Sequence, residues 1–401
     1  MTEMENRESE QLQLLSETES GLRLQRIRRA MADRALDAVL ISDNANIYYL
    51  TGRVFCGFIF IPADGEPLYA VRRPCHLKGR RTVAIHKVEE LPPMAGLLHG
   101  ATLGLEMGTS PYNAIARIQK AFGDRLKFAD ASPVMAAARS VKTDAEIEQI
   151  RISGVRQTAL YHRIPRLFQP SMRDIDLQVE IERAARLEGC LGQFRISGDD
   201  MELFMGNVLV GDNADSPSPY DFAMGGAGMD PSLPVGADGT LITRGVSVMV
   251  DVNGNFTGYM TDMTRCYSID SDLPRRAIDA HRLSIDICAT LADMGRPGVE
   301  AKALYEKALS MATEAGFANE FMGHRQHAGF VGHGVGIEIN ELPVLAPRSK
   351  SILEAGNVIA IEPKFVIPGV GALGIENTYV VRPQGAMQCL TLAPQEITCF
   401  E

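Results

Sequence analysis

The stretch D-V-N-G-N-F-T-G-Y-M-T-D-M-T-R, residues 251–265, constrains the fold of this chain more than any other. The segment before it, V-S-V-M-V at 246–250, is almost entirely apolar and is typical of a buried strand that ends on the first aspartate. The Asn-Gly pair at 253–254 favours a tight turn, and the alternation over 256–268 predicts a returning strand. The pattern therefore predicts a β-hairpin that carries an aspartate on each strand.

Asp251 and Asp262 can point at one place if these two strands are antiparallel neighbours. A single aspartate at the end of a strand is more often a solvated turn residue, because its side chain hydrogen-bonds readily to nearby backbone groups. A common role for the two aspartates therefore depends on what the rest of the chain brings to them.

Three later stretches supply candidate partners: G-H-G-V-G-I-E with His333, I-A-I-E-P-K with Glu362, and G-I-E-N-T with Glu376. Each acid closes or interrupts an apolar run, where an unpaired buried charge costs several kcal/mol. Convergence of these acids with the two aspartates would require cations, and two divalent ions would neutralise four carboxylates and acidify a water molecule between them. A set of carboxylate oxygens with one imidazole favours Mn, Co, Fe or Zn over a structural thiolate site.

These motifs and their order resemble the metallopeptidase family of prolidase, aminopeptidase P and methionine aminopeptidase, whose "pita-bread" fold creatinase shares. The resemblance implies that two metal ions are held at five positions, with Asp262 and Glu376 bridging. In this sequence those positions are Asp251, Asp262, His333, Glu362 and Glu376.

The first part of the chain is similar to the N-terminal domain of prolidase and creatinase, through L-D-A-V-L-I at 36–41 and N-I-Y-Y-L-T-G at 46–52. The expected organisation is a polar arm over residues 1–20, an α/β N-terminal domain over 21–140, and an α+β pita-bread catalytic domain over 141–401. The two-domain resemblance also implies a homodimer.

Helices are predicted in the second domain by four stretches: 144–168, 172–189, 273–294 and 299–315. The stretch 206–239 is dense in Gly, Pro, Asp and Ser, which predicts a long functional loop.

The chain departs from the peptidases of the family at two places. The Pro-His step that usually precedes the first aspartate is here Pro234-Val235, and a second family histidine is replaced by Asn340. Asparagine can hydrogen-bond a substrate carbonyl but cannot carry a proton near neutral pH. Asn340 is therefore a candidate for binding substrate, with Glu362 as the carrier of the proton. His327 is a further catalytic candidate, although a solvated loop histidine is the simpler interpretation.

The resulting prediction is a metal-dependent hydrolase, similar to Xaa-Pro peptidases, that acts on a short peptide or a small amide. Two alternatives remain open. One is a lyase or hydrolase of a small zwitterion, since a dimethylsulfoniopropionate lyase has this fold. The other is a peptide-binding module without catalysis, although such proteins usually lose their metal ligands.

Composition limits the partners of the chain. The net charge is −10 and no Lys/Arg-rich run occurs, which argues against nucleic acid or an anionic membrane as a partner. No apolar run is long enough to span a bilayer, and the polar, acidic residues at the start of the sequence predict no secretory signal. Seven widely spaced cysteines, none in a CxxC pair, predict reduced and mostly buried thiols in a cytoplasmic protein.

Overall fold

The chain divides into two units, and the sequence passes from the first to the second between Arg139 and Ser140. The computed structural model describes residues 10–198, 203–220, 222–270 and 272–401. The first nine residues of the predicted polar arm therefore lie outside the described residues. In the rest of the arm, Leu12 is buried and its N–H donates to the carbonyl of Lys78 at 2.8 Å.

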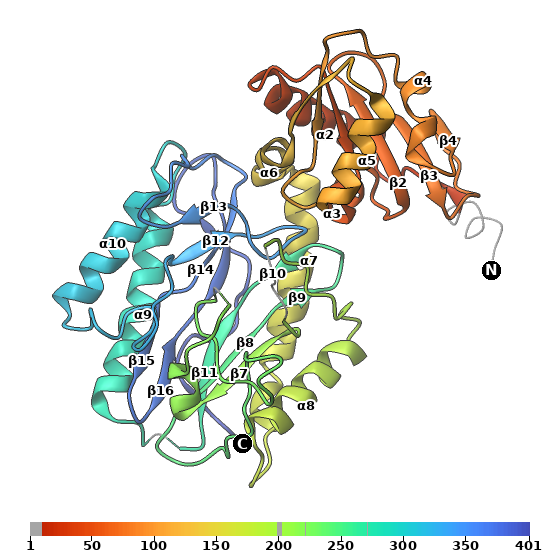
Figure 1. The fold of residues 1–401 in the computed structure, drawn as a ribbon. Helices are drawn as coiled ribbons and strands as arrows, with labels where there is room; N and C mark the ends of the chain where they lie inside the picture. Colours follow the sequence, from red (N-terminus) through yellow and green to blue (C-terminus); the bar gives the residue numbers. More distant parts are fainter. Residues whose placement is uncertain (1–9, 199–202, 221, 271) are drawn as a thin grey trace. The chain divides into compact units, whose positions relative to one another are not determined.

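A six-stranded mixed sheet organises the first unit (Figure 1), with the strand order β4-β3-β2-β1-β5-β6. Its central strand pairs antiparallel with β2 and parallel with β5, and all four of its residues are buried. The strands are β1 (Ala38–Ile41), β2 (Cys56–Pro62), β3 (Leu68–Arg73), β4 (Thr82–Ala84), β5 (Thr102–Leu105) and β6 (Lys127–Asp130). The helices are α2 (Glu17–Ala32), α3 (Asn44–Thr51), α4 (Pro92–Ala95), α5 (Tyr112–Phe122) and α6 (Ser132–Ser140).

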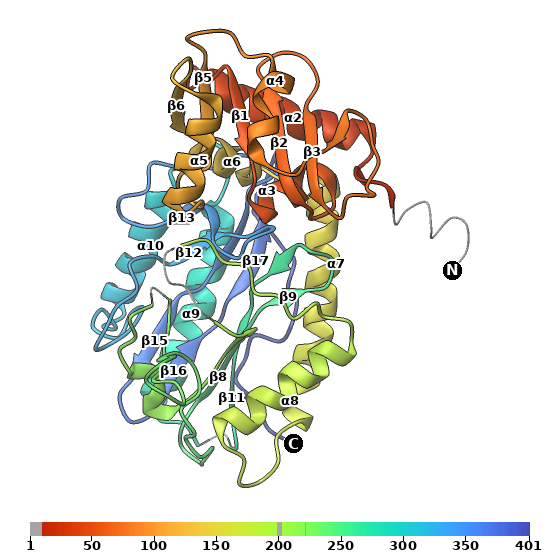
Figure 2. The ribbon, with the colours of Figure 1, turned by 45° about the vertical axis from the view of Figure 1, so that its right-hand side comes forward.

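Four long helices flank the sheets of the second unit, and Figures 1 and 2 show α7 and α8 on one side of the strands with α9 and α10 on the other. They are α7 (Asp144–Tyr161), α8 (Asp174–Leu187), α9 (Arg275–Met294) and α10 (Ala301–Glu314). The first of them begins with a capping box, in which the Thr143 hydroxyl accepts from the Glu146 N–H and the Glu146 carboxylate accepts from the Thr143 N–H. Short 3₁₀ turns lie at Val88–Glu90, Ile164–Arg166 and Gly211–Asp215.

The strands of the second unit form two larger sheets and two small ribbons. One sheet has the order β19-β11-β8-β7, with β7 (Gly206–Val210), β8 (Val248–Val252), β11 (Thr264–Ser268) and β19 (Thr398–Cys399). The other has the order β13-β12-β14-β17-β18, with β12 (Gly332–Gly334), β13 (Glu341–Leu345), β14 (Val358–Ile361), β17 (Asn377–Val380) and β18 (Gln388–Cys389). The ribbons pair β9 (Gly254–Asn255) with β10 (Met260–Thr261), and β15 (Lys364–Ile367) with β16 (Gly371–Gly374).

The predicted hairpin exists, but its turn lies elsewhere. Strands β8 and β11 are antiparallel and place Asp251 opposite Thr264. The connection does not turn at 253–254, because β9 continues the chain and pairs with β10, so that the reversal falls at 256–259. The stretch predicted as a loop over 206–239 also begins with β7, whose five residues are all buried.

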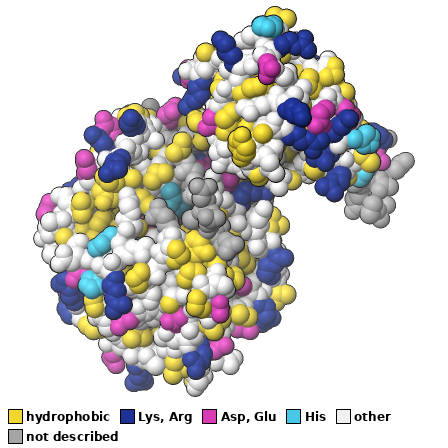
Figure 3. All heavy atoms as spheres, viewed as in Figure 1, with side chains coloured by type: hydrophobic (Ala, Val, Ile, Leu, Met, Phe, Trp, Pro, Cys, Tyr) yellow, Lys and Arg dark blue, Asp and Glu magenta, His cyan; other side chains and the backbone are white. Residues whose placement is uncertain are grey.

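All seven cysteines are free thiols, of which Cys190, Cys266 and Cys288 are buried, while Cys56, Cys75 and Cys399 are exposed. The prediction that they are mostly buried was therefore wrong. In the described part of the chain, no helix combines the length and the apolar character that a membrane crossing needs. On the face shown in Figure 3, acidic, basic and hydrophobic side chains are interspersed over the second unit.

Candidate metal centre

The five predicted ligands come from different strands of the second unit and meet at one place. Asp251 lies on β8, Asp262 directly precedes β11, and His333 lies on β12. Glu362 directly follows β14 and Glu376 directly precedes β17, which are antiparallel neighbours. An isolated bridge between Thr264 and Glu376 joins the two sheets at the site.

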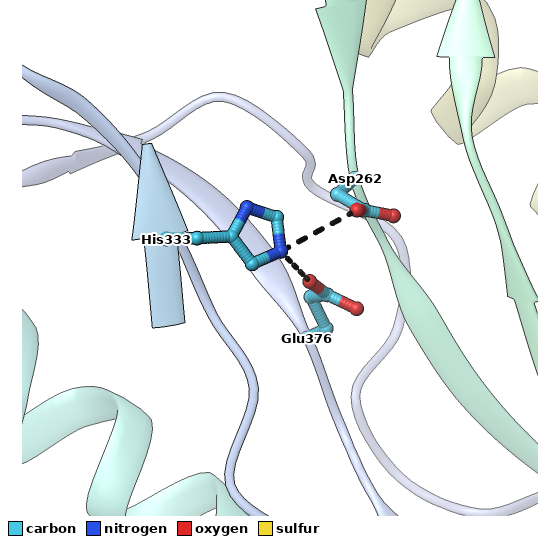
Figure 4. Close-up of side chains that lie close together, drawn as sticks. All are labelled: Asp262, His333 and Glu376. Carbon is cyan, nitrogen blue, oxygen red and sulfur yellow. Dashed lines mark ion pairs between the residues drawn. The ribbon is translucent and has the colours of Figure 1, made fainter. Parts of the chain in front are cut away.

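His333 and three carboxylates surround a small space. The imidazole Nε2 lies 3.9 Å from Asp262 Oδ2 and 4.0 Å from Glu376 Oε1, the two ion pairs drawn in Figure 4. The same nitrogen lies 3.3 Å from Glu362 Oε1. Asp262, Glu362 and Glu376 are each at most 9% exposed. Such a concentration of buried carboxylates needs compensation by positive charge.

Lys364, a residue that the sequence analysis did not single out, supplies part of that charge. Its side chain is fully buried, and Nζ donates to Asp251 Oδ2 at 2.8 Å, to Glu362 Oε2 at 2.7 Å and to Glu376 Oε2 at 3.2 Å. A sequence signal was present, because a lysine that opens the apolar strand K-F-V-I must find an acidic partner if it is buried.

The pKa values in the cluster follow from burial and from these neighbours. Burial raises the pKa of Asp262 to about 7, and the charge of Asp251 adds to the shift. Burial also raises the pKa of Glu376 well above its usual value, with a further contribution from Asp262 and Glu362. For Glu362, burial acts in the same direction but is outweighed by Lys364 and His333, and the pKa falls to about 2.

The neighbouring carboxylates raise the pKa values of the imidazole and the ammonium. Burial disfavours the charged form of His333, yet the hydrogen bond and the charge of Glu362, together with Asp262, raise its pKa to about 9. Lys364 is also disfavoured by burial, but Asp251, Glu362 and Glu376 raise its pKa well above the usual value. The cluster thus holds Lys364 as an ammonium.

Hydroxyl groups and one guanidinium fix the strands that carry the acids. Thr264 Oγ1 donates to Glu376 Oε2 at 2.8 Å, and Thr378 Oγ1 accepts from the N–H of Asp262 at 2.8 Å. Arg265 is buried and donates to the carbonyls of Thr264, Glu376, Ala393 and Pro394 and to Asn377 Oδ1. The guanidinium therefore joins backbone segments behind the site and makes no contact with the carboxylates that the structure records.

A cavity of ≈ 420 Å³ opens onto the cluster. Its acidic side chains and its imidazole are those of Asp251, Asp262, His333, Glu362 and Glu376. Its apolar part includes Phe194, Leu203, Phe222, Phe330, Ile339 and Val344. A small substrate can therefore reach the acids and the imidazole while apolar walls restrict water.

The other predicted site residues take different places. Asn340 lines the cavity, but its amide is engaged by the backbone of Ser197, since Oδ1 accepts from the Ser197 N–H at 2.8 Å and Nδ2 donates to the Ser197 carbonyl. His327 does not line this cavity; its Nδ1 lies 2.9 Å from the carbonyl of Phe321. Val235 is 1% exposed and is also absent from the cavity wall.

A divalent cation fits the group formed by Asp262, His333 and Glu376, whose ligand atoms all lie within 4.8 Å of one another. Ligand atoms around a tetrahedral ion, at bond lengths of about 2.0–2.2 Å, lie roughly 3.3–3.6 Å apart, slightly less than the 3.9 and 4.0 Å that separate His333 Nε2 from Asp262 Oδ2 and Glu376 Oε1. In addition, Glu376 Oε1 is buried and has no hydrogen-bond partner in the described part of the chain. A buried carboxylate oxygen without a partner is what a missing ligand bond would leave behind.

Comparison with known proteins identifies the family. Residues 148–383 match the model of metallopeptidase family M24, and residues 23–141 match that of the creatinase/prolidase N-terminal domain. The chain belongs to metallopeptidase family M24. Family membership confirms the resemblance drawn from the motifs and the predicted enzyme class, a metal-dependent hydrolase.

Among its relatives is the Xaa-Pro dipeptidase of Pyrococcus horikoshii, 24% identical over 380 residues that cover 94% of this chain and 98% of the relative. The Xaa-Pro dipeptidase structure from Bacillus anthracis has a TM-score of 0.79 at 21% identity, covering 95% of this chain and 99% of that one. The X-Pro aminopeptidase structure from Thermotoga maritima has a TM-score of 0.75 at 22% identity, covering 94% and 99%. These similarities confirm the predicted pita-bread fold.

Proposed function

We propose that this M24 enzyme hydrolyses the amide bond of a short peptide or a similar small amide, using a divalent cation held by Asp262, His333 and Glu376. The observation that carries the proposal is the convergence of these three ligands at the inner end of a cavity, where Glu376 Oε1 has no hydrogen-bond partner among the described residues. Because relatives bear the name Xaa-Pro dipeptidase, Xaa-Pro dipeptides are the first substrates to test.

A divalent cation in this position would polarise the scissile carbonyl and make water a better nucleophile. The chain's own residues supply the other functions. Glu362 faces the cavity as a carboxylate and is the group that accepts the proton from the attacking water and passes it to the leaving nitrogen. The apolar walls hold the substrate and limit the entry of water.

Asn340 has a different role in this proposal from the one its sequence position suggested. Both ends of its amide are engaged by Ser197, so Asn340 positions the 194–198 segment, which forms part of the cavity wall. A catalytic contribution of His327 would need that side chain to leave its contact with Phe321.

A second substrate class is kept open by the residues at the two positions where peptidases of the family carry histidine. Val235 does not line the cavity, and the amide of Asn340 is engaged by the backbone of Ser197. The described residues that line the cavity include four acidic side chains and no lysine or arginine, and they would attract the cationic group that a dipeptide and a compact zwitterion both carry. A small zwitterionic amide is therefore the alternative substrate, and a lyase reaction on such a compound is the alternative chemistry.

The identity of the metal, the cation positions, the assembly and the location belong to the same proposal. The ligand set suits Mn, Co, Fe or Zn, and the two overlapping acidic groups offer two cation positions. The assembly is a homodimer, as the two-domain organisation of the family implies, and the site of action is the cytoplasm.

The test is to strip the purified protein with a chelator, restore Mn or Co, and measure hydrolysis of Xaa-Pro dipeptides against other dipeptides and compact betaine-like compounds. Activity should disappear on chelation and return with metal. Activity that survives exhaustive chelation would contradict the proposal. A metal-binding protein that turns over neither Xaa-Pro dipeptides nor any other peptide would favour the zwitterion class. A protein that binds no metal would favour a peptide-binding module.

A further inference from the structure

Lys364 is placed in the cluster by its position two residues after Glu362. Successive side chains of an extended backbone alternate, so residues two apart point to the same side. With Pro363 between them, Glu362 and Lys364 both face the acids, and Lys364 Nζ donates to Glu362 Oε2 at 2.7 Å. The Lys364 side chain is 0% exposed, so protein atoms surround it on every side.

The ammonium fills a position that a cation would otherwise take. Asp251, Glu362 and Glu376 each offer a carboxylate oxygen within 4.8 Å of the others, which makes them a potential metal site. Lys364 Nζ contacts one oxygen of each at 2.7–3.2 Å. An ammonium has three N–H donors, so three carboxylates use its hydrogen-bonding capacity completely.

Glu362 and Glu376 divide the cluster into two halves. Each gives its Oε2 to Lys364 and turns its Oε1 toward His333, at 3.3 Å from Nε2 for Glu362 and 4.0 Å for Glu376. Asp251 lies on the lysine side and Asp262 on the histidine side. The cluster therefore has two adjacent cation positions, and the covalently attached ammonium occupies one of them.

The charge of the site argues against a second metal ion beside this lysine. Four carboxylates carry at most four negative charges. Two divalent ions would already neutralise them, and the ammonium would then add a positive charge that only a further anion, such as a bound hydroxide, could compensate in the buried site. One divalent ion with the ammonium leaves the cluster close to neutral.

We propose that Lys364 is a built-in cation that takes the place of a second metal ion, so that each chain binds one divalent ion, at Asp262, His333 and Glu376. This inference rests on the proposed function in one respect, the assignment of a metal ion to Asp262, His333 and Glu376. It changes the expected dinuclear centre into a mononuclear one paired with an ammonium.

The experiment counts metal ions instead of measuring turnover. The chelated chain is loaded with excess Mn²⁺, desalted and analysed for manganese per chain by plasma mass spectrometry, and the Mn²⁺ electron paramagnetic resonance spectrum is recorded. The wild type should bind one ion per chain and give the spectrum of isolated Mn²⁺. Lys364→Met, which keeps the length of the side chain and removes its charge, should bind close to two ions per chain with a spin-coupled spectrum.

Lys142→Met is the matched control. Lys142 is also buried, at 1% side-chain exposure, and its Nζ lies 2.9 Å from Glu341 Oε2. Its replacement removes a buried lysine of the same kind from a different ion pair, and the metal content should remain one ion per chain.

Two ions or none in the wild type would overturn the proposal, as would a folded Lys364→Met variant that still binds only one. If that variant does not fold, the wild-type count and spectrum decide alone. The hydrolase proposal is judged separately, since wild-type protein with one ion and no peptidase activity would contradict only that function, and active protein with two coupled ions would contradict only the role of Lys364.

Discussion

Thr378 Oγ1 is hydrogen-bonded to both backbone polar groups of Asp262: it accepts from the N–H at 2.8 Å and donates to the carbonyl at 2.9 Å. Both residues are buried; Thr378 lies on β17, and Asp262 directly precedes β11, which belongs to the other large sheet of the second unit. This one hydroxyl therefore fixes the position of a proposed metal ligand relative to the strand that follows Glu376.

Replacement of Thr378 by valine should destabilise the protein and weaken metal binding together. Valine has nearly the shape of threonine but leaves the Asp262 N–H and carbonyl without their partner, which costs about 1–3 kcal/mol for a buried polar group. Urea unfolding and Mn²⁺ titration measure the two effects. Thr378→Ser keeps the hydroxyl and should retain wild-type metal affinity, and unaltered affinity in the valine variant would contradict a positioning role.

Tyr161 provides a second support under the hairpin. Its Oη accepts from the N–H of Val252 at 3.0 Å and donates to the carbonyl of Met263, so it ties the strand of Asp251 to the residue after Asp262. Burial raises the pKa of Tyr161 well above its usual value, which keeps the phenol protonated as a donor. Tyr161→Phe should lower the free energy of unfolding by about 1–3 kcal/mol.

Tyr267→Phe is the comparison for this variant, because the Tyr267 hydroxyl is also buried but, among the described residues, makes only a 3.4 Å contact with the carbonyl of Tyr161. Chemical denaturation of both variants should show a clearly smaller loss for Tyr267→Phe. Equal losses would mean that the hydrogen bonds of Tyr161 are not the cause.

Arg265 should not be replaceable by lysine. Its guanidinium reaches five acceptors on the backbone and side chains around β11 and β17, an arrangement that needs the planar fork of arginine. Arg265→Lys should lower the free energy of unfolding by roughly 2–4 kcal/mol, since several buried carbonyls lose their donors. Arg275→Lys, which alters an exposed i,i+4 ion pair with Asp279, should change it by less than about 1 kcal/mol.

The sequence was informative about the four acids and the imidazole because their chemistry makes them costly without a common partner. Carboxylates that end apolar runs point to convergence whatever the topology. The long helices were equally accessible, since amphipathic periodicity and the Thr143 cap are local signals. The ends of these helices were harder to predict from the sequence: α7 ends at Tyr161, before the predicted end at residue 168.

Lys364 and β7 were missed for a different reason. Both depend on long-range packing: besides the nearby Glu362, Lys364 contacts Asp251, which is 113 residues away, and Glu376. Strand β7 lies in a stretch rich in turn-forming residues and is recruited by pairing with β8. The prediction of a turn at 253–254 was wrong for a similar reason, because the pairing of β9 with β10 overrides the local preference of Asn-Gly for a turn.

Removal of the imidazole should separate metal binding from folding. His333→Ala deletes a proposed ligand from the edge of the cavity and should weaken Mn²⁺ binding by at least about 10–100-fold, the loss typical of residues that only support a ligand. His162→Ala replaces an exposed histidine at the end of α7 and should leave affinity unchanged. Titration of both variants with Mn²⁺, with circular dichroism as a check on folding, makes the comparison. Equal affinities would exclude His333 as a ligand.

Metal affinity should also rise with pH. In the metal-free protein the pKa of Asp262 is raised to about 7, and that of His333 to about 9. Ligation requires a carboxylate and a neutral imidazole, so at a pH below these values binding must expel protons and is weakened. The dissociation constant for Mn²⁺ should therefore fall as the pH increases from about 6 to about 9, and the number of protons released should decline over the same range. Calorimetric titration in buffers of different ionisation enthalpy measures both quantities. In His333→Gln the change in affinity at the upper end of this pH range should disappear. An affinity that does not vary with pH in the wild type would show that Asp262 and His333 are already deprotonated before the metal binds.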